Sequence, residues 1–281
     1  MAMQHIKHIS DIRALTKNWR TCHQSIALVP TMGNLHEGHL SLVAEAQKHA
    51  EKVIVSIFVN PSQFGLNEDF ATYPRTEEQD CQRLNTAGVD AVFLPSIDLM
   101  YPIDDRIVVD VTRISQIYCG ASRAGHFSGV ATVVCKLLNI TQPDIALFGL
   151  KDFQQFKVIQ CLVRDLHLPT TLVGVQTVRE KDGLAMSSRN QYLSEQERLI
   201  APMLYRTLCW AKDRLIAGCH FKTIENEAIQ QLTHTGLEVD YFSIANQHLH
   251  PAQSNDQSFI ILAAAKLGNT RLIDNINVDF K

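Results

Sequence analysis

One stretch decides the fold of this chain: Pro30-Thr31-Met32-Gly33-Asn34-Leu35-His36-Glu37-Gly38-His39. It follows an apolar run at residues 26–29 and precedes a segment, from Leu40 onward, in which apolar residues recur with helical spacing. This order predicts a strand, a glycine-containing turn and the start of a helix. Free backbone N–H groups and the positive end of the helix dipole meet at such a junction, so it suits an anion such as a phosphate group.

The two histidines of this stretch are the first candidates for chemistry. His36 and His39 are three residues apart, which places both imidazoles on one face of a helix N-terminus. Each ring could donate a hydrogen bond to a phosphate oxygen there. Two other interpretations stay open. The pair could ligate a metal ion, although the spacing of a zincin is absent, or both could be ordinary surface histidines of a chain that has 12.

Composition restricts the class of protein. The chain has 281 residues, of which 46% are hydrophobic and 20% are charged, as in a globular protein with one large or two modest domains. Its net charge is -3, and no basic run follows a single element. This balance argues against nucleic acid as a partner and favours a small substrate.

Cysteine usage and hydropathy predict a cytoplasmic protein. The seven cysteines form no Cys-x-x-Cys pair, as expected of reduced thiols rather than of a disulfide framework. Residues 1–10 lack the apolar segment of a signal peptide. The most apolar later stretch, residues 259–265, is far shorter than the roughly 20 residues that span a bilayer. We therefore expect no membrane association.

Predicted strands and helices alternate in the first part of the chain. Strands are predicted at 26–29, 53–59, 91–94, 107–111, 145–148 and 171–175. Helices are predicted at 10–19, directly after the opening stretch, and at 76–87, 130–140 and 149–166, with Ser10 and a capping box at Thr76–Gln79 as start signals. The run at 53–59 is largely β-branched, which is typical of strands buried on both faces. A parallel sheet of five or six strands is expected.

The pattern changes after Val178. A charged turn at 179–183 is followed by predicted helices at 194–217 and 224–232, the first of which begins with the capping box Ser194-Glu195-Gln196-Glu197. Strands are predicted at 239–244, 259–264 and 270–273. The sequence therefore predicts a parallel-sheet domain at residues 1–178 and a small α+β domain at residues 179–281.

Polar residues follow the strand predicted at 53–59. Open α/β sheets bind ligands beyond the carboxyl ends of their strands, so Asn60 and Gln63 are candidates for reading the polar groups of a substrate. The alternative is an ordinary Asn-Pro turn. Further along, the glycine-containing, basic loop at 119–127 is either a mobile lid or a plain surface loop.

Two later segments carry groups suited to phosphate. Lys151 begins a predicted helix and offers a point charge, and Gln155 lies one turn further on the same side. The alternative for Lys151 is a surface ion pair with Asp152. The loop at 186–190 crowds two hydroxyls, an amide and the guanidinium of Arg189, which can surround a triphosphate.

These motifs, in this order, resemble those of one family. His36-Glu37-Gly38-His39 after a strand is similar to the motif with which the nucleotidylyltransferase superfamily contacts ATP phosphates. The whole chain resembles the pantothenate synthetase (pantoate-beta-alanine ligase) family nearly from end to end. The motifs that carry the resemblance are residues 30–39, Asn60-Pro61-Ser62-Gln63-Phe64, Tyr73–Thr76, Gly125–Phe127, Lys151-Asp152-Phe153-Gln154-Gln155, Asp182–Ala185, Met186–Asn190 and Thr270–Asn275.

The resemblance implies a fold and a reaction. The implied fold is α/β: a Rossmann-like parallel-sheet domain with an HxGH motif at residues 1–178, which binds ATP and pantoate, and a small C-terminal α+β lid domain at residues 179–281. The implied reaction condenses (R)-pantoate with beta-alanine to (R)-pantothenate and converts ATP to AMP and pyrophosphate through an enzyme-bound pantoyl adenylate. The family also implies Mg²⁺ that travels with ATP, and a homodimer.

The same resemblance implies site residues, position by position. ATP contacts are expected from Pro30, Thr31, Met32, Gly33, Asn34, Leu35, His36, Glu37, Gly38, His39, Gly149, Leu150, Lys151, Asp152, Val178, Met186, Ser187, Ser188 and Arg189. The expected catalytic residues are His36, His39, Lys151 and Arg189, with His39 as the proton donor. Pantoate is expected to contact Gln63 and Gln155, with Asn60 beside them in the pantoate and beta-alanine site.

Two residues depart from the family's usual pattern. Leu150 stands where a glutamate is usual, which removes a charge near the ATP site, and Ser62 stands where a methionine is usual. Two rival functions also stay open. One is an adenylyltransferase acting on a phosphate-bearing acceptor, against which the neutral amides of Gln63 and Gln155 argue. The other is a protein that senses ATP without turnover.

Overall fold

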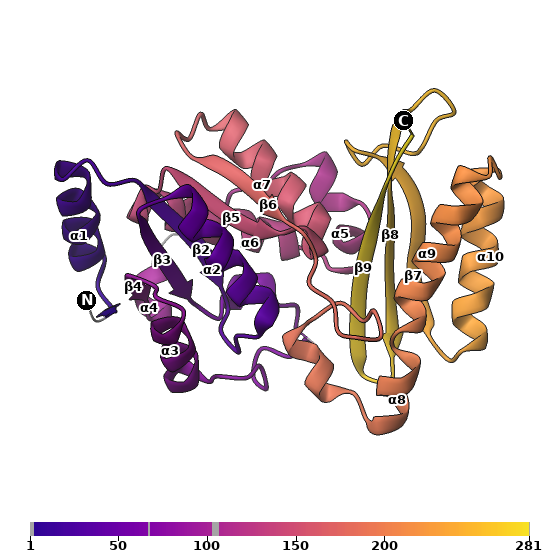
Figure 1. Ribbon diagram of the computed structural model, residues 1–281, viewed down its shortest axis with the longest axis horizontal. Helices are drawn as coiled ribbons and strands as arrows, with labels where there is room; N and C mark the ends of the chain where they lie inside the picture. The colour runs from indigo at the N-terminus through magenta and orange to yellow at the C-terminus, as the bar shows by residue number, and fades with distance from the viewer. Residues whose placement is uncertain (1–2, 67, 103–106, 281) are drawn as a thin grey trace. The chain divides into compact units, whose positions relative to one another are not determined.

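The computed structural model describes residues 3–66, 68–102 and 107–280 (Figure 1). The chain divides into two compact units. The first contains Met1–Leu150 and Gln155–Gln176, and the second contains Lys151–Gln154 and Thr177–Lys281. The short segment Lys151–Gln154 thus groups with the C-terminal part of the chain.

The first unit is built on a six-stranded parallel sheet. Its strands are β1 Gln4–Ile6, β2 Ile26–Thr31, β3 Lys52–Ile57, β4 Ala91–Phe93, β5 Ile145–Gly149 and β6 Thr171–Val175. They are ordered β1-β4-β3-β2-β5-β6, and every neighbouring pair is parallel. The chain winds outward in opposite directions from β2 and from β5, so a topological switch point lies between the carboxyl ends of these two strands. The expected α/β class with a parallel sheet is confirmed.

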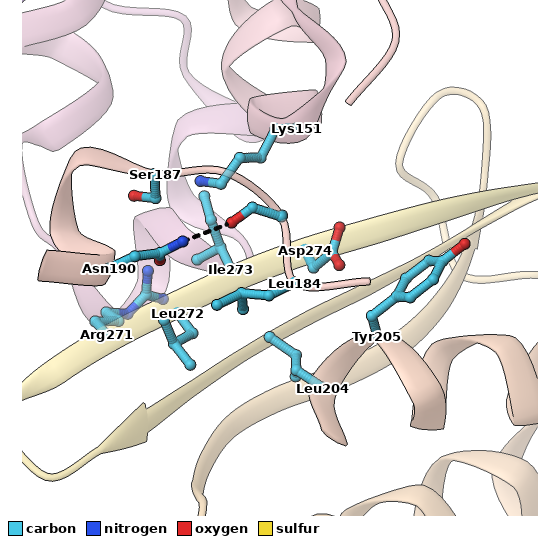
Figure 2. Close-up of a pocket in the computed structure, with 11 residues that line it drawn as sticks. Lys151, Leu184, Ser187, Asn190, Leu204, Tyr205, Arg271, Leu272, Ile273 and Asp274 are labelled. Atoms are coloured by element: carbon cyan, nitrogen blue, oxygen red, sulfur yellow. Dashed lines mark hydrogen bonds between the residues drawn. The ribbon is translucent and has the colours of Figure 1, made fainter. Parts of the chain in front are cut away.

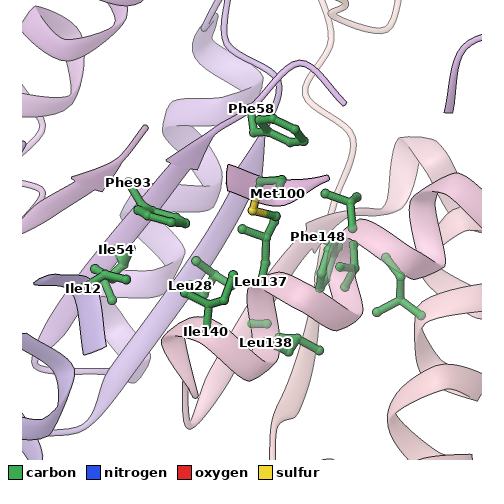
Figure 3. Close-up of a cluster of buried hydrophobic side chains, with 14 of the residues drawn as sticks. Ile12, Leu28, Ile54, Phe58, Phe93, Met100, Leu137, Leu138, Ile140 and Phe148 are labelled. Carbon is green, nitrogen blue, oxygen red and sulfur yellow. The ribbon is translucent and has the colours of Figure 1, made fainter. Parts of the chain in front are cut away.

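Helices cover both faces of this sheet. They are α1 Ile9–Thr21, α2 Glu37–His49, α3 Glu77–Thr86, α4 Ile97–Met100, α5 Cys119–Ser122, α6 His126–Thr141 and α7 Phe153–Asp165, with 3-10 turns η1 Pro61–Gln63, η2 Arg113–Gln116 and η3 Leu150–Asp152. Alternate residues of a strand point to opposite faces. Ile54 of β3 packs into the hydrophobic cluster shared with α1, α6 and α7 (Figure 3), whereas Val53 and Val55 pack into the cluster shared with α2 and α3. Burial on both faces explains the continuous β-branched run.

The second unit combines an antiparallel sheet with helices. Strands β7 Glu238–Asn246, β8 Ser258–Leu267 and β9 Thr270–Asp279 pair in that order. The helices are α8 Glu195–Ile200, α9 Met203–Ile216 and α10 Phe221–His234, preceded by the 3-10 turn η4 Ser188–Tyr192. Phe259 and Ile261 of β8 pack in one cluster with residues of α9 and α10, which include Leu208 and Ile224. Within the described ranges, no helix is long and apolar enough to cross a membrane.

Two predicted elements are wrong. Residues 107–111 form no strand: the backbone N–H of Val109 donates to the hydroxyl of Thr132 at 2.9 Å, so α6 holds this segment instead of a neighbouring strand. The helix predicted at 194–217 is two helices, α8 and α9, because Pro202 has no N–H to continue the hydrogen-bond ladder. The three-residue strand β1 is too short to show a pattern and was missed.

The capping signals differ in outcome. The capping box at Ser194 is present as predicted. Thr76 does not cap α3, because its hydroxyl donates to the carboxylate of Asp80 at 3.0 Å. Ser10 lies inside α1 rather than at its start: His8 occupies the N-cap position, and the Ser10 hydroxyl donates to the carboxylate of the next residue.

Candidate active site

The turn between β2 and α2 requires a glycine at its first bend. Gly33 has a φ of +81°, and a Cβ atom there would lie 3.0 Å from Asp80 Oδ2 and 3.1 Å from Ile57 Cγ2. Both the left-handed backbone and the lack of space exclude larger residues. The turn follows the carboxyl end of β2 at the switch point, which is where open α/β sheets bind ligands.

Asp80 of α3 holds this turn in place. Its carboxylate, in a side chain only 2% exposed, accepts the backbone N–H groups of Asn34 and Leu35, both at 2.8 Å. Arg83, one turn along α3, donates to the carbonyl oxygen of Leu35 at 2.6 Å. Asp80 is not among the site residues predicted from the sequence. The only signal for it, an acidic residue four positions after Thr76, looks like the acidic first turn of any helix.

His36 and His39 form the N-terminal cap of α2. The Nδ1 atom of His36 accepts the N–H of Gly38 at 3.1 Å, and the Nδ1 atom of His39 accepts the backbone N–H of His36 at 3.2 Å. The two ring centroids are 4.1 Å apart. A ring nitrogen that accepts a hydrogen bond carries no proton, so the proton of each neutral ring lies on Nε2. The cap therefore orients both histidines as Nε2–H donors.

The turn after β3 brings Asn60 and Gln63 together. Asn60 is 1% exposed and caps η1. Its Nδ2 atom donates to Oε1 of Gln63 at 3.0 Å and to the carbonyl oxygen of Gly129 at 3.1 Å. The Nε2 atom of Gln63 lies 3.0 Å from the sulfur of Met32, in the turn after β2. Asn60 is thus a buried support behind Gln63, and Gln63 is the half-buried member of the pair.

Gly129 of α6 allows η1 to approach this helix closely. A Cβ atom at this position would lie 2.2 Å from the carbonyl oxygen of Ser62 and 2.7 Å from the backbone nitrogen of Gln63. Both neighbours are backbone atoms, so neither can move without displacing the turn. The absence of a side chain at Gly129 therefore determines where Gln63 stands.

A second set of contacts fixes the backbone of Gln63. His126 Nδ1 lies 2.8 Å from the carbonyl oxygen of Gln63 and donates to it, because a carbonyl can only accept. Arg123 Nη1 lies 3.0 Å from the other ring nitrogen, and the Nε and Nη2 atoms of Arg123 form a two-pronged ion pair with Glu68, at 2.7 and 2.6 Å. Burial acts to raise the pKa of Glu68, but the hydrogen bonds and charge of Arg123 prevail and lower it. The loop at 119–127 is therefore anchored to the turn after β3.

The residues after β5 form the third predicted group. The strand ends at Gly149, and η3 leads into α7. Leu150, at the position where a glutamate is usual, packs beside β6, since a Cβ atom on Gly174 would lie 2.6 Å from Leu150 Cδ2. An apolar contact thus replaces the missing charge. Gln155 is half-buried in the first turn of α7.

Lys151 lines a pocket of the second unit (Figure 2). The polar lining of this pocket comes from Lys151, Ser187, Asn190, Tyr205, Arg271 and Asp274. Asn275 Nδ2 donates to the carbonyl oxygen of Lys151 at 2.8 Å, which ties this segment to β9. Ser187 caps η4 by accepting the N–H of Arg189 at 3.2 Å. The pocket therefore brings together two of the residues predicted for phosphate, Lys151 and Ser187.

The loop that carries Val178 and Met186 is closed by backbone contacts. The N–H of Met186 donates to the carbonyl oxygen of Val178 at 3.0 Å, and Arg179 forms an antiparallel bridge with Ala185. Ser188 is the first residue of η4. The predicted residues from Val178 to Ser188 thus belong to one folded loop of the second unit.

Asp274 and Arg179 form a buried ion pair that ties this loop to β9. Two parallel hydrogen bonds join them, at 2.5 and 2.9 Å, and Asp274 is 4% exposed. The guanidinium also lies over the ring of Tyr205, 3.6 Å from its centroid. Burial raises the pKa of Asp274, and the charge of Arg179 acts in the opposite direction.

Removing one partner of this pair is expected to destabilise the second unit. Asp274→Ala should lower the free energy of unfolding by about 3 to 5 kcal/mol, because Arg179, whose side chain is only 18% exposed, loses its counter-charge. Chemical denaturation measures the change. The control is Asp165→Ala, since Asp165 and Arg164 form a pair whose side chains are 60% and 71% exposed, and its loss should leave stability nearly unchanged. Equally small losses for both variants would contradict the structural role of Asp274.

Fold and site together define a class of protein. The sheet presents a helix N-terminus with two Nε2–H donors at its switch point, and a firmly held amide, that of Gln63, follows the neighbouring strand. An α/β enzyme that binds a phosphate-bearing ligand beside a small polar substrate has this arrangement.

Comparison with known proteins gives the family. The sequence profile of Pantoate-beta-alanine ligase matches residues 4–277. The chain is 50% identical over 286 residues to the pantothenate synthetase of Colwellia psychrerythraea, with 99% of each chain covered. It is also 50% identical over 279 residues to that of Alcanivorax borkumensis, with 98% of each covered.

Solved structures agree with the sequence comparison. Pantothenate synthetase from Thermus thermophilus is similar with a TM-score of 0.92 at 39% identity, covering 98% of this chain and 99% of that one. Pantoate-beta-alanine ligase from Francisella tularensis, complexed with beta-gamma ATP and beta-alanine, has a TM-score of 0.83 at 36% identity, covering 98% and 97%. This chain belongs to the pantoate-beta-alanine ligase family. It is a ligase that condenses pantoate with beta-alanine in an ATP-dependent reaction.

Proposed function

We propose that the phosphates of ATP bind at the N-terminus of α2 and that pantoate binds beside them, at the turn after β3. One observation carries this proposal. His36 and His39 use Nδ1 to cap the helix and present Nε2–H at an end that already favours anions. Beta-gamma ATP and beta-alanine, the ligands of the Francisella relative, are of the kind this site would hold.

The proposed ATP contacts are those expected from the sequence. They comprise Pro30–His39, Gly149–Asp152, Val178 and Met186–Arg189. Lys151 and Arg189 would supply positive charge to the phosphates, whereas the two histidines would supply N–H groups.

Gln63 and Gln155 are proposed to hold pantoate. Both are neutral amides that follow parallel strands, β3 and β5, and so suit the oxygens of a small hydroxy acid better than those of a phosphate-bearing acceptor. Asn60 would act through Gln63, which it supports from the buried side. Beta-alanine would enter the same site after pantoate has been activated.

The proposed reaction has two steps. A carboxylate oxygen of pantoate attacks the α-phosphorus of ATP, and pyrophosphate leaves to give enzyme-bound pantoyl adenylate. The neutral amine of beta-alanine then attacks the acyl carbon, AMP leaves with the bridging oxygen, and the nitrogen loses a proton. Activation is needed because a carboxylate is a poor acylating agent, whereas the mixed anhydride has AMP as a good leaving group.

The residues of this chain contribute mainly position and charge stabilisation. In the first step the Nε2–H groups of His36 and His39, with Lys151 and Arg189, would stabilise the charge that grows on pyrophosphate. Gln63 would hold pantoate in line with the α-phosphorus. No residue of the chain needs to form a covalent bond to the substrate.

We propose that Mg²⁺ enters with ATP. Over the described residues, no three His, Cys, Asp or Glu side chains are grouped so as to hold a metal ion. Mg²⁺ bound with a nucleotide usually takes its ligands from phosphate oxygens, water and one or two carboxylates. When bound it would neutralise phosphate charge, while the N–H donors of the α2 cap orient the phosphates.

Pyrophosphate release tests the proposed function. With ATP and Mg²⁺, steady release should require both pantoate and beta-alanine, and pantothenate should form in equal amount. Steady release with a phosphate-bearing acceptor in place of pantoate would indicate an adenylyltransferase. ATP binding without any release would indicate a sensor.

A substitution at Gly129 tests the pantoate site. Gly129→Ala should raise the KM for pantoate about tenfold or more, because the new methyl group displaces the turn that carries Gln63. The KM for ATP should change less than about threefold. Gly65→Ala is the control, since Gly65 has no positive φ and a Cβ atom there would make only ordinary contacts, the nearest at 3.6 Å from Glu68 Cγ. An unchanged pantoate KM in a folded Gly129→Ala protein would count against this placement of pantoate.

We also propose that the C-terminal domain, residues 179–281, is a lid on the bound nucleotide, and that residues 1–178 bind ATP and pantoate. This proposal is based on the division of the predicted phosphate contacts: Ser187 and Arg189 belong to the second unit, whereas His36 and His39 belong to the first. Hydrogen exchange should slow at Gln176–Val178 when ATP and pantoate bind together. Identical exchange with and without the ligands would contradict a hinge there.

We also propose that the protein is a cytoplasmic homodimer. All seven cysteines are free thiols, as in a reducing compartment. Ile107 and Val108 are 80% and 66% exposed, an apolar area that a second copy would cover. Analytical ultracentrifugation should give the mass of two chains, and the mass of one chain at micromolar concentration would contradict a dimer.

A further inference from the structure

Two hydroxyl groups outside the proposed site meet at the buried amide of Asn60. Its Oδ1 atom accepts the hydroxyl proton of Tyr101 at 2.7 Å and lies 2.8 Å from Ser62 Oγ and 3.3 Å from the Ser62 N–H. The two hydroxyl oxygens are 2.9 Å apart. Tyr101 is 5% exposed and Asn60 1% exposed. The oxygen end of this amide is therefore surrounded by donors.

The opposite end of the same amide faces acceptors. The carbonyl of Gly129 can only accept and the N–H of Ser62 can only donate, so together they assign the nitrogen and oxygen of Asn60. A second N–H donor cannot face the Asn60 nitrogen. Gln63 must then turn Oε1 inward, at 3.0 Å from Asn60 Nδ2, and keep its own NH₂ group on the other side, against the sulfur of Met32.

We infer that Tyr101 and Ser62 are positioning residues that determine what Gln63 offers to the substrate. Their hydroxyls fix Asn60, Asn60 fixes Oε1 of Gln63, and Gln63 therefore presents N–H rather than C=O. The group it selects is an oxygen that accepts hydrogen bonds, such as a carboxylate or hydroxyl oxygen of pantoate. This inference rests on the proposed pantoate site.

In this chain, either of the two hydroxyls alone can donate a hydrogen bond to Oδ1 of Asn60. Ser62 replaces the methionine that is usual in the family, so it adds a second hydroxyl beside that of Tyr101. Loss of either one leaves Oδ1 of Asn60 with another hydroxyl donor. Loss of both leaves only the Ser62 N–H at 3.3 Å, which weakens the restraint on a buried amide.

A double-variant cycle tests the inference. Ser62→Ala and Tyr101→Phe alone should each raise the KM for pantoate less than about threefold, whereas the double variant should raise it about tenfold or more. The KM for ATP should stay within about twofold in all three variants. Ser62→Thr in the Tyr101→Phe background keeps a hydroxyl and should restore the pantoate KM. Ser128→Ala removes a hydroxyl of α6 that donates to Asp110 instead, and serves as the control.

Three results would overturn the inference. They are a double variant with an unchanged pantoate KM, an equal rise in both KM values, and failure of the Ser62→Thr protein to recover. If the Ser62→Ala double variant does not fold, Ser62→Val in the Tyr101→Phe background replaces it: valine matches threonine in shape but has no hydroxyl, so the pantoate KM should be about tenfold or more above that of Ser62→Thr in the same background. A wild-type protein that makes no pantothenate would instead refute the proposed function, before any variant is compared.

Discussion

Replacing His39 by alanine is expected to slow pantoyl adenylate formation by roughly 10² to 10³ in a single turnover, the loss that follows removal of one preorganised donor to a transition state. The Nδ1 atom of His39 is engaged in the cap of α2, which orients Nε2–H as the donor. Charge on pyrophosphate grows as the bond breaks, so this hydrogen bond strengthens in the transition state. The variant should therefore lose kcat rather than affinity for ATP. Rapid-quench measurement of the pantoyl adenylate and AMP formed from ATP gives the rate of adenylate formation.

The second half of the reaction is an internal control for His39→Ala. Supplied with preformed pantoyl adenylate and beta-alanine, the variant should make pantothenate at a near-normal rate, because no pyrophosphate is present. Equal damage to both halves would mean that His39 serves only to hold the turn.

The variant His39→Glu distinguishes the role of His39 in capping α2 from its role as a hydrogen-bond donor in adenylation. Glutamate at the third helical position can accept the backbone N–H of His36, as in a capping box, but it has no proton to donate. This variant should keep the stability of the wild type and be at least as slow as His39→Ala in adenylation. Recovery of the rate in His39→Glu would contradict the role given to the Nε2–H group.

Asp80→Ala is expected to have the second large effect. Two backbone N–H groups, that of the buried Leu35 and that of the half-buried Asn34, lose their acceptor, at about 1 to 3 kcal/mol each. The free energy of unfolding should fall by about 2 to 6 kcal/mol. The turn that carries the histidines would also lose its position, and a displacement near 1 Å can reduce a rate about 10²-fold. Denaturant titration and kcat/KM for ATP measure the two effects.

Two variants control the experiment on Asp80. Asp80→Asn keeps the shape of the side chain but replaces one acceptor by a donor, so it should recover only part of the loss. Asp98→Ala removes an exposed carboxylate of α4 in the same unit and should change neither quantity. If Asp80→Ala loses stability but keeps its kcat/KM for ATP, Asp80 is a structural tie without a role in positioning the turn.

Much of the sheet could be predicted because burial leaves a periodic trace in the sequence. Val53, Ile54 and Val55 alternate between two helix-covered faces, so the whole strand is apolar and is easily recognised. The strand at 171–175 was predicted with the bounds it has. Residues 107–111 are also largely β-branched, yet the backbone N–H of Val109 donates to the hydroxyl of Thr132 rather than to a neighbouring strand. Composition alone does not say whether a partner strand is available.

Residues of the candidate site could be predicted from the sequence only where they directly follow a predicted strand. The histidine pair and Gln63 lie at strand ends, so their sequence neighbours identify them. Asp80 and Gly129 act on segments 46 and 69 positions away, and nothing near them in the sequence indicates those contacts. Tyr101 likewise reaches Asn60 from 41 positions away. Residues that position others depend on tertiary contacts, and these become visible only in the fold.

Oxygen transfer from pantoate to AMP tests the proposed adenylate most directly. Pantoate with ¹⁸O in its carboxylate is incubated with the protein, ATP, Mg²⁺ and beta-alanine, and the products are separated by mass. One ¹⁸O atom should appear in each AMP, because the carboxylate oxygen that attacks the α-phosphorus stays with AMP when the amide forms. Pyrophosphate should carry none. If AMP contains only unlabelled oxygen while pantothenate still accumulates, the reaction does not proceed through pantoyl adenylate.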